Sequence, residues 1–139
     1  MRSGAPTIGS MLTVGAGGAL GAVLRWALGE LVPDGDGFPW TTFAINVTGS
    51  LALALLPTLT VVRRRPLLPL FLGTGMLGGF TTLSAYADQA RELLDDGAVG
   101  LAGVYLTGTL AAAVLAVLLA RHLTTDSERD TFEEEEGNE

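Results

Sequence analysis

The chain contains no cysteine, no lysine and a single histidine among its 139 residues. Without cysteine it can form neither a disulfide nor a thiolate metal site. The histidine, His122, lies beyond the last long apolar stretch, and the apolar stretches hold no nucleophile paired with a base. The sequence therefore offers no residues for an enzymatic function.

Long apolar runs fill most of the chain, which is 48% hydrophobic and has a positive mean hydropathy. Each run is long enough to cross a bilayer core of about 30 Å. We expect the first run to be retained as a helix, because cleaving it as a leader would leave only three spans. The prediction is an all-α integral membrane domain over residues 1–125, with four transmembrane helices at about 8–31, 39–62, 67–94 and 98–120.

The third apolar run is too long for one straight helix. From Leu67 to Leu94 a continuous helix would measure about 42 Å, and two glycines and two β-branched threonines adjoin within it at 78–82. Broken backbone at membrane depth persists only where it lines a cavity or is buried in protein. We predict a helix break near 78–82, with an ion or small-solute site at 78–84.

The formal net charge of −7 comes from the C-terminal segment. Residues 126–139 carry eight acids and one base, Arg129, whereas residues 1–125 carry seven acids and seven arginines. A run of like charge is typical of a disordered, solvated tail, so 126–139 is predicted to be an acidic disordered cytoplasmic tail. A regulatory or cation-binding role for it is the alternative.

The arginines favour one orientation in the membrane. Four spans would place both chain ends and the 63–66 loop on the same side, and five arginines fall there against two on the other side. The positive-inside rule then puts both termini in the cytoplasm. The two groups are Arg2, Arg63, Arg64, Arg65 and Arg121 against Arg25 and Arg91.

Polar residues recur at helical spacing in the second and fourth runs: Thr42, Asn46 and Ser50, then Tyr105, Thr109 and Ala113. Facing one another, the two stripes would form a path lined by hydrogen-bond donors. An asparagine amide in a bilayer needs partners, so Asn46 either bonds a neighbouring helix or faces a permeating anion. Arg25 likewise either has a partner or extends to the membrane surface.

Glycines carry two further patterns. Gly17 and Gly21 form a small-xxx-small pair that favours close helix packing. Gly73, Gly75 and Gly78 match the dinucleotide-binding fingerprint, but that motif requires a preceding strand and a βαβ unit. We therefore reject nucleotide binding and expect no nucleic-acid partner.

Three ordered motifs resemble the fluoride channel family, also called Fluc or CrcB, over about residues 9–122. They are Gly17-Gly18-x-x-Gly21-Ala22-x-x-Arg25, Thr42-x-x-x-Asn46-x-x-Gly49-Ser50 and Gly75-x-x-Gly78-Gly79-Phe80-Thr81-Thr82-x-Ser84.

The resemblance implies an antiparallel, dual-topology dimer of four-helix subunits in the cell membrane, with two pores for passive fluoride exit that reduces toxicity. It also implies a structural sodium ion at the dimer interface, held here by the backbone carbonyls of Gly78 and Thr81. The fluoride-path residues that it implies, with Tyr105 from the fourth-run stripe, are Arg25, Asn46, Leu83, Ser84, Tyr86, Tyr105 and Thr109.

The chemistry suits the ion, since a pore must replace fluoride's tightly held water with amide, hydroxyl or aromatic-edge donors. The chain departs from the family at Leu83 and Tyr86, where two phenylalanines are usual. Leucine offers no ring edge, whereas Tyr86 keeps a ring and adds a hydroxyl. Ala113 and Thr41 also replace a usual serine and glycine.

The strong charge bias opposes insertion in both directions, so we predict that the chain is one half of a heterodimer with an oppositely oriented paralogue. A non-conducting partner subunit is the alternative that Leu83 and Ala113 suggest. A small multidrug-type exporter would need a glutamate inside the first span, where Glu30 stands only at the far end. Asp88 is the one acid deep enough to invite that interpretation.

Overall fold

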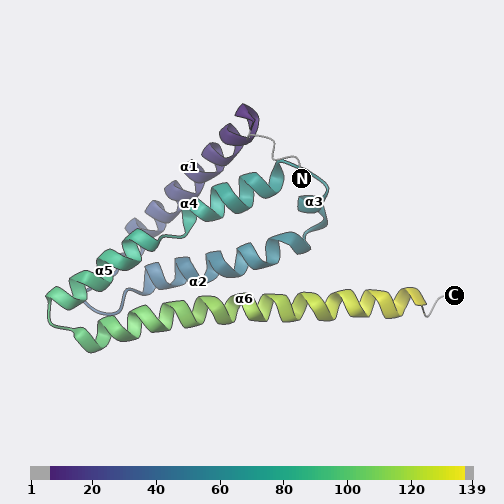
Figure 1. The fold of residues 1–139 in the computed structure, drawn as a ribbon. Coiled ribbons are helices and arrows are strands. Elements are labelled where there is room, and N and C mark those ends of the chain that lie inside the picture. Colours follow the sequence, from purple (N-terminus) through teal and green to yellow (C-terminus); the bar gives the residue numbers. More distant parts are fainter. Residues whose placement is uncertain (1–6, 137–139) are drawn as a thin grey trace.

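The computed structural model describes the backbone of residues 7–136 and the side chains through Thr124, and within this range every regular element is helical (Figure 1). The all-α prediction is confirmed. The elements are α1 (Ile8–Leu31), α2 (Trp40–Leu55), the 3₁₀ turn η1 (Leu56–Thr58), α3 (Thr60–Arg63), the π-helix η2 (Leu70–Leu77), α4 (Gly78–Phe80), α5 (Leu83–Asp95) and α6 (Val99–Glu136).

Three segments are long and apolar enough to cross a membrane: Ile8–Leu31, Trp40–Thr58 and Val99–Thr124. The chain is therefore a multi-pass membrane protein. The third apolar run is divided among η2, α4 and α5, and α5 has 13 residues. At about 1.5 Å per residue, no single one of these pieces spans a core of about 30 Å.

The backbone breaks between α4 and α5, which confirms the break that the sequence predicts near 78–82. Thr81 and Thr82 adopt extended conformations, with φ/ψ of −73°/153° and −144°/117°. Thr82 then restarts the helix, because its side-chain oxygen accepts the Ala85 N–H at 3.1 Å. Such N-capping satisfies a backbone donor at a helix start that has no partner within the helix.

Glycines allow α1 to lie directly against the backbone of η2 and α4. Gly17 and Gly21 are buried, and a Cβ at either would overlap backbone atoms of η2. Gly79 faces the Gly18 backbone in the same way. The small-residue pattern in the sequence therefore marks a packed helix pair, as small residues commonly do in membranes.

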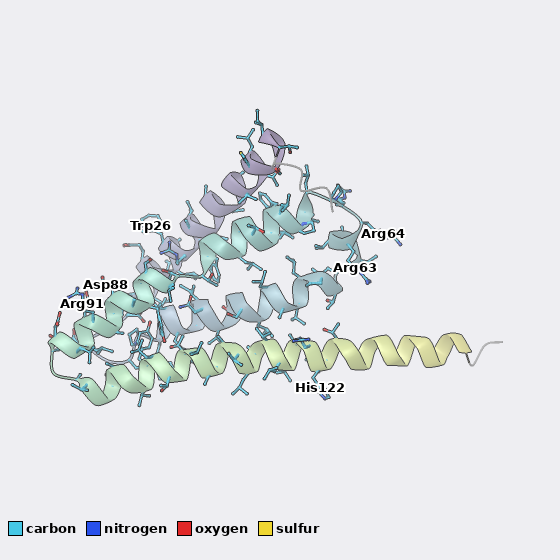
Figure 2. All side chains as sticks on the ribbon, in the orientation of Figure 1. Trp26, Arg63, Arg64, Asp88, Arg91 and His122 are labelled. Atoms are coloured by element: carbon cyan, nitrogen blue, oxygen red, sulfur yellow. The ribbon has the colours of Figure 1, made fainter. Side chains whose placement is uncertain are left out.

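On the other side of the molecule α2 and α5 both pack on α6. The α1–α2 loop and the α5–α6 turn lie at one end of the bundle, with α3 and the start of α1 at the other (Figure 1). Figure 2 shows Arg63 and Arg64 at one end and the Asp88–Arg91 pair at the other.

α6 continues through residues 126–136, for which the charge run predicts disorder. Extending an existing helix is easier than nucleating a new one, and glutamate has a good helix propensity. The separate solvated tail of 126–139 stays a prediction.

Candidate functional site

A cavity of about 230 Å³ lies beside the helix break, between α2, the start of α5, and α6. Four of the predicted path residues meet there: Asn46, Leu83, Tyr86 and Thr109. The full lining is Asn46, Ser50, Thr81, Thr82, Leu83, Tyr86, Thr109, Leu110 and Ala113. The two polar stripes that the sequence predicts to face each other thus contribute to one cavity, while the roles of their residues stay predictions.

Asn46 holds the broken backbone in place. Its side-chain Nδ2 donates to the Thr82 carbonyl at 3.0 Å, and the Thr82 N–H donates to Oδ1 at 2.8 Å. The amide therefore does bond a neighbouring segment. Because Nδ2 carries two hydrogens, one donor of this cavity-lining residue remains, so the two interpretations of Asn46 are compatible.

Thr109 carries an unusual hydroxyl. The residue is 4% exposed, and Oγ1 has no hydrogen-bond partner within the part of the chain that the structure describes. Helical threonines often donate to the carbonyl four residues earlier, as Thr107 does to Gly103 at 2.7 Å. Buried polar atoms nearly always have a partner, so the hydroxyl of Thr109, a residue that lines the cavity, is a donor that lacks its acceptor.

Most other hydroxyls of the cavity are already engaged. Thr81 Oγ1 donates to the Leu77 carbonyl at 3.0 Å, and the Tyr86 hydroxyl donates to the Leu106 carbonyl at 2.5 Å. Tyr86 therefore offers the cavity its ring rather than its proton. The side chain of Ser50 makes no hydrogen bond to another described residue, so its hydroxyl is a second available donor.

Two predicted path residues, Ser84 and Tyr105, lie outside the cavity lining. Ser84 is exposed, and its hydroxyl pairs with that of Thr82 at 3.2 Å, outside the cavity lining. Tyr105 is fully buried in the α5–α6 core and donates to Gln89 Oε1 at 2.8 Å. Leu83 lines the cavity but is 77% exposed. The structure thus does not bring Ser84 and Tyr105 to the cavity surface.

Arg25 has a partner, which resolves the two alternatives left by the sequence. Its Nε donates to the carbonyl of Gly79, within α4, at 3.3 Å. The residue also lines a second cavity, of about 330 Å³, that Thr82 shares. Thr82 therefore stands between the two cavities, and Asn46 fixes it there.

The break also frees the carbonyls assigned to sodium. In a continuous helix the Gly78 and Thr81 carbonyls would accept from residues 82 and 85. Here the Thr82 N–H donates to Asn46, and the Ala85 N–H donates to Thr82 Oγ1. Both oxygens are left available, as cation ligation by unwound backbone requires. The described residues contain no carboxylate, histidine or cysteine cluster that could hold a metal.

Asp88 lies away from these cavities (Figure 2). It forms an exposed ion pair with Arg91 at 3.0 Å, and both side chains are 61% exposed. Its charge is thus paired with an arginine one helical turn away on the same helix.

The comparisons with known proteins decide the family. The family model described as "CrcB-like protein, Camphor Resistance (CrcB)" matches residues 12–121. The chain belongs to the CrcB family. This family's match includes every residue of the cavity and of the helix break.

Several curated relatives are similar along most of their length. A protein of Nocardia farcinica, named fluoride-specific ion channel FluC 2, is 45% identical over 78% of this chain and 80% of its own. The fluoride-specific ion channel FluC of Opitutus terrae is 43% identical over 78% and 86%. FluC 1 of Streptomyces coelicolor is 41% identical over 86% and 77%.

Sequence reasoning missed Asp34 and Gln89, which lie beside the second cavity. Asp34 sits in a turn-forming loop, and its partner Gln89 is 55 positions away. No periodicity connects two such residues, so only the folded arrangement reveals them.

Proposed function

We propose that this CrcB-family chain is a subunit of a fluoride-selective channel that lets fluoride leave the cytoplasm and so reduces its toxicity. The observation that carries the proposal is Thr109, which lines the cavity and has a buried hydroxyl without an acceptor. A small anion is the partner that such a donor can take. The curated names of the relatives support fluoride as that anion.

The cavity has the chemistry for passage rather than tight capture. Its available donors are neutral, from Thr109, Ser50 and the second N–H of Asn46. No lysine or arginine lines it. Conduction requires binding strong enough to replace hydration but weak enough to allow release, and neutral donors meet both conditions. Arg25 in the adjacent cavity would attract anions toward the break.

A second subunit completes the proposed path. Leu83 is largely exposed and has no ring, while Tyr86 contributes one aromatic ring to the cavity. Aromatic edges from an oppositely oriented paralogue would supply the missing donors. We propose an antiparallel heterodimer in the cell membrane, in which η2, α4 and α5 together form the third of four crossings and both termini are cytoplasmic.

The freed carbonyls of Gly78 and Thr81 support a structural sodium ion at that dimer interface. Backbone oxygens are hard, partially negative ligands that suit such a cation. Two carbonyls are too few to surround it, whereas the same two from an antiparallel partner would double the set. The ion would hold the two helix breaks together, and it takes no part in moving fluoride.

A non-conducting partner subunit is the second candidate, because Leu83 removes an aromatic donor from the path. The two roles differ in a growth assay. Bacteria that lack their own fluoride exporter should grow at otherwise inhibitory fluoride when they express this chain together with its paralogue, and should grow less well when this chain carries Thr109→Val. Equal growth with the paralogue alone would instead assign the non-conducting role.

A further inference from the structure

Asp34, in the α1–α2 loop, forms hydrogen bonds with both α2 and α5. Its Oδ1 accepts the Thr41 N–H at 2.6 Å, and its Oδ2 accepts both the N–H and the hydroxyl of Thr42, at 3.3 and 3.1 Å. Pro39, at the N-cap of α2, makes no capping bond. Asp34 therefore caps α2 from a distance and places a negative charge where the helix dipole favours one.

The same carboxylate determines how Gln89 of α5 is oriented. Oδ2 of Asp34 also accepts from Gln89 Nε2, at 3.1 Å. An ionised carboxylate can only accept, and an amide has one donor end and one acceptor end. Gln89 must therefore turn its NH₂ toward Asp34, which leaves Oε1 to accept the Tyr105 hydroxyl at 2.8 Å. Amide orientation follows from such networks.

We call the hydrogen-bonded group of Asp34, Thr41, Thr42, Gln89 and Tyr105 the junction. It lies one helical turn from the donors of the cavity. Thr42 precedes Asn46 by one turn on α2, and Tyr105 precedes Thr109 by one turn on α6. The Tyr105 ring also packs against that of Tyr86, with 5.1 Å between the ring centroids. The junction thus fixes the rotation of both helices that carry the donors.

We propose that Asp34 is a positioning residue for the anion path, acting through Gln89 and Tyr105. This inference rests on the proposed fluoride channel function and adds a determinant of its geometry. The charge on Asp34 commits the Tyr105 proton to Gln89, and the cap on α2 sets the position of Asn46. Together they hold the Thr109 and Asn46 donors at one cavity.

The substitution Gln89→Glu tests whether the orientation of residue 89 controls flux, because it makes the hydrogen bond to Asp34 depend on pH. At low pH the introduced carboxyl is neutral, and it can donate to Asp34 while accepting from Tyr105, as the Gln89 amide does. When the pH rises and this carboxyl ionises, a second negative charge appears beside Asp34 and the junction opens. Fluoride flux relative to wild type should then fall on the order of tenfold between about pH 5 and pH 8.

The other charged groups near the junction are the same in wild type and in Gln89→Glu. Wild-type fluoride flux measured at each pH therefore corrects for their contribution. Protein-free liposomes correct for leakage of neutral acid. Asp34 and Gln89 line the second cavity with Arg25 and Glu30 of α1. They also line a third cavity, of about 250 Å³, whose charged groups are Asp36 of the loop and Glu92 and Asp96 at the end of α5.

The exchange variant Asp34→Asn with Gln89→Glu provides the rescue. The amide introduced at position 34 can accept from Thr41 and donate to the carboxylate introduced at position 89, which still accepts from Tyr105. The Thr42 hydroxyl can turn to accept from the new NH₂ group, and only the long 3.3 Å bond of the Thr42 N–H is lost. Flux through the exchange variant should return to within about threefold of wild type and lose the pH dependence, because the pair again holds one charge. A merely structural contribution of Asp34 would produce no such reversal.

Three outcomes would overturn the proposal. A pH-independent Gln89→Glu channel, or an exchange variant no better than Gln89→Glu at high pH, would remove the positioning role while leaving the channel function intact. Silent wild-type protein would instead defeat the channel function, and the positioning role with it. The pH dependence of the melting temperature of Gln89→Glu in detergent reports on the junction separately from flux.

Discussion

At the scale of the residue, the function depends on which hydroxyls are free. Thr107 and Thr109 lie on the same helix, yet only Thr107 donates to the preceding turn. A backbone carbonyl accepts the Thr107 hydroxyl, whereas the Thr109 hydroxyl is left available to a ligand. A donor without an acceptor inside a protein is unfavourable, and such a feature persists where function requires it.

Thr109→Val should therefore lower fluoride flux about tenfold or more, because it removes the donor while keeping the shape of the side chain. The melting temperature in detergent should not fall, since no intramolecular hydrogen bond is lost. Flux through proteoliposomes and thermal unfolding measure the two effects on the same preparation.

The matched control is Thr107→Val, at an exposed position on α6 that loses its bond to Gly103. Flux through this variant should equal that of wild type. Equal flux in Thr109→Val would show that the free hydroxyl does not serve the anion.

Helical spacing found Asn46 and Thr109 correctly as neighbours of one cavity, because both stripes follow the geometry of regular helices. The same spacing places Tyr105 on the Thr109 stripe, but the Tyr105 hydroxyl donates to Gln89 and the residue does not line the cavity. That orientation depends on Asp34, whose bond to Gln89 crosses 55 positions of sequence. Long-range polar partners leave no periodic signal, so the sequence could not predict the junction.

At the scale of the element, two features position the site. They are the break between α4 and α5 and the close packing of α1 against η2 and α4. The length of the third apolar run predicted the break, and the two threonines located it. The π-helical winding of η2 was not predicted. It occurs in the part of the run where glycines allow α1 to pack directly against the backbone. Spacing and composition do not distinguish π from α winding over so short a segment.

Gly21→Ala should destabilise the protein by about 2 kcal/mol or more, because the added Cβ would overlap the Met76 carbonyl oxygen and push α1 from η2. Arg25 would then lose its contact with Gly79, so flux should also fall. Thermal unfolding in detergent, followed by tryptophan fluorescence, measures the first effect.

Gly15→Ala serves as the comparison on the same helix, since nothing lies within 4 Å of its added Cβ. Alanine has the higher helix propensity, so this variant should be at least as stable as wild type. If both variants were equally stable, the close packing of α1 would not contribute to the fold.

At the scale of the whole molecule, the account predicts one orientation and a second subunit. The absence of cysteine makes orientation directly measurable. Gly35→Cys in the α1–α2 loop should react with a membrane-impermeant maleimide in intact cells, and Pro66→Cys in the loop after Arg65 should not. Labelling of both positions would show dual topology and favour a homodimer over the heterodimer.

Fluoride efflux from proteoliposomes tests the central claim most directly. The chain is reconstituted alone and together with its oppositely oriented paralogue, and a fluoride electrode follows release beside a parallel chloride measurement. The account predicts rapid fluoride release without comparable chloride release from the mixture, with release from the single chain alone indicating a homodimer. Fluoride release no faster than from protein-free liposomes in both preparations, or equal release of chloride, would contradict it.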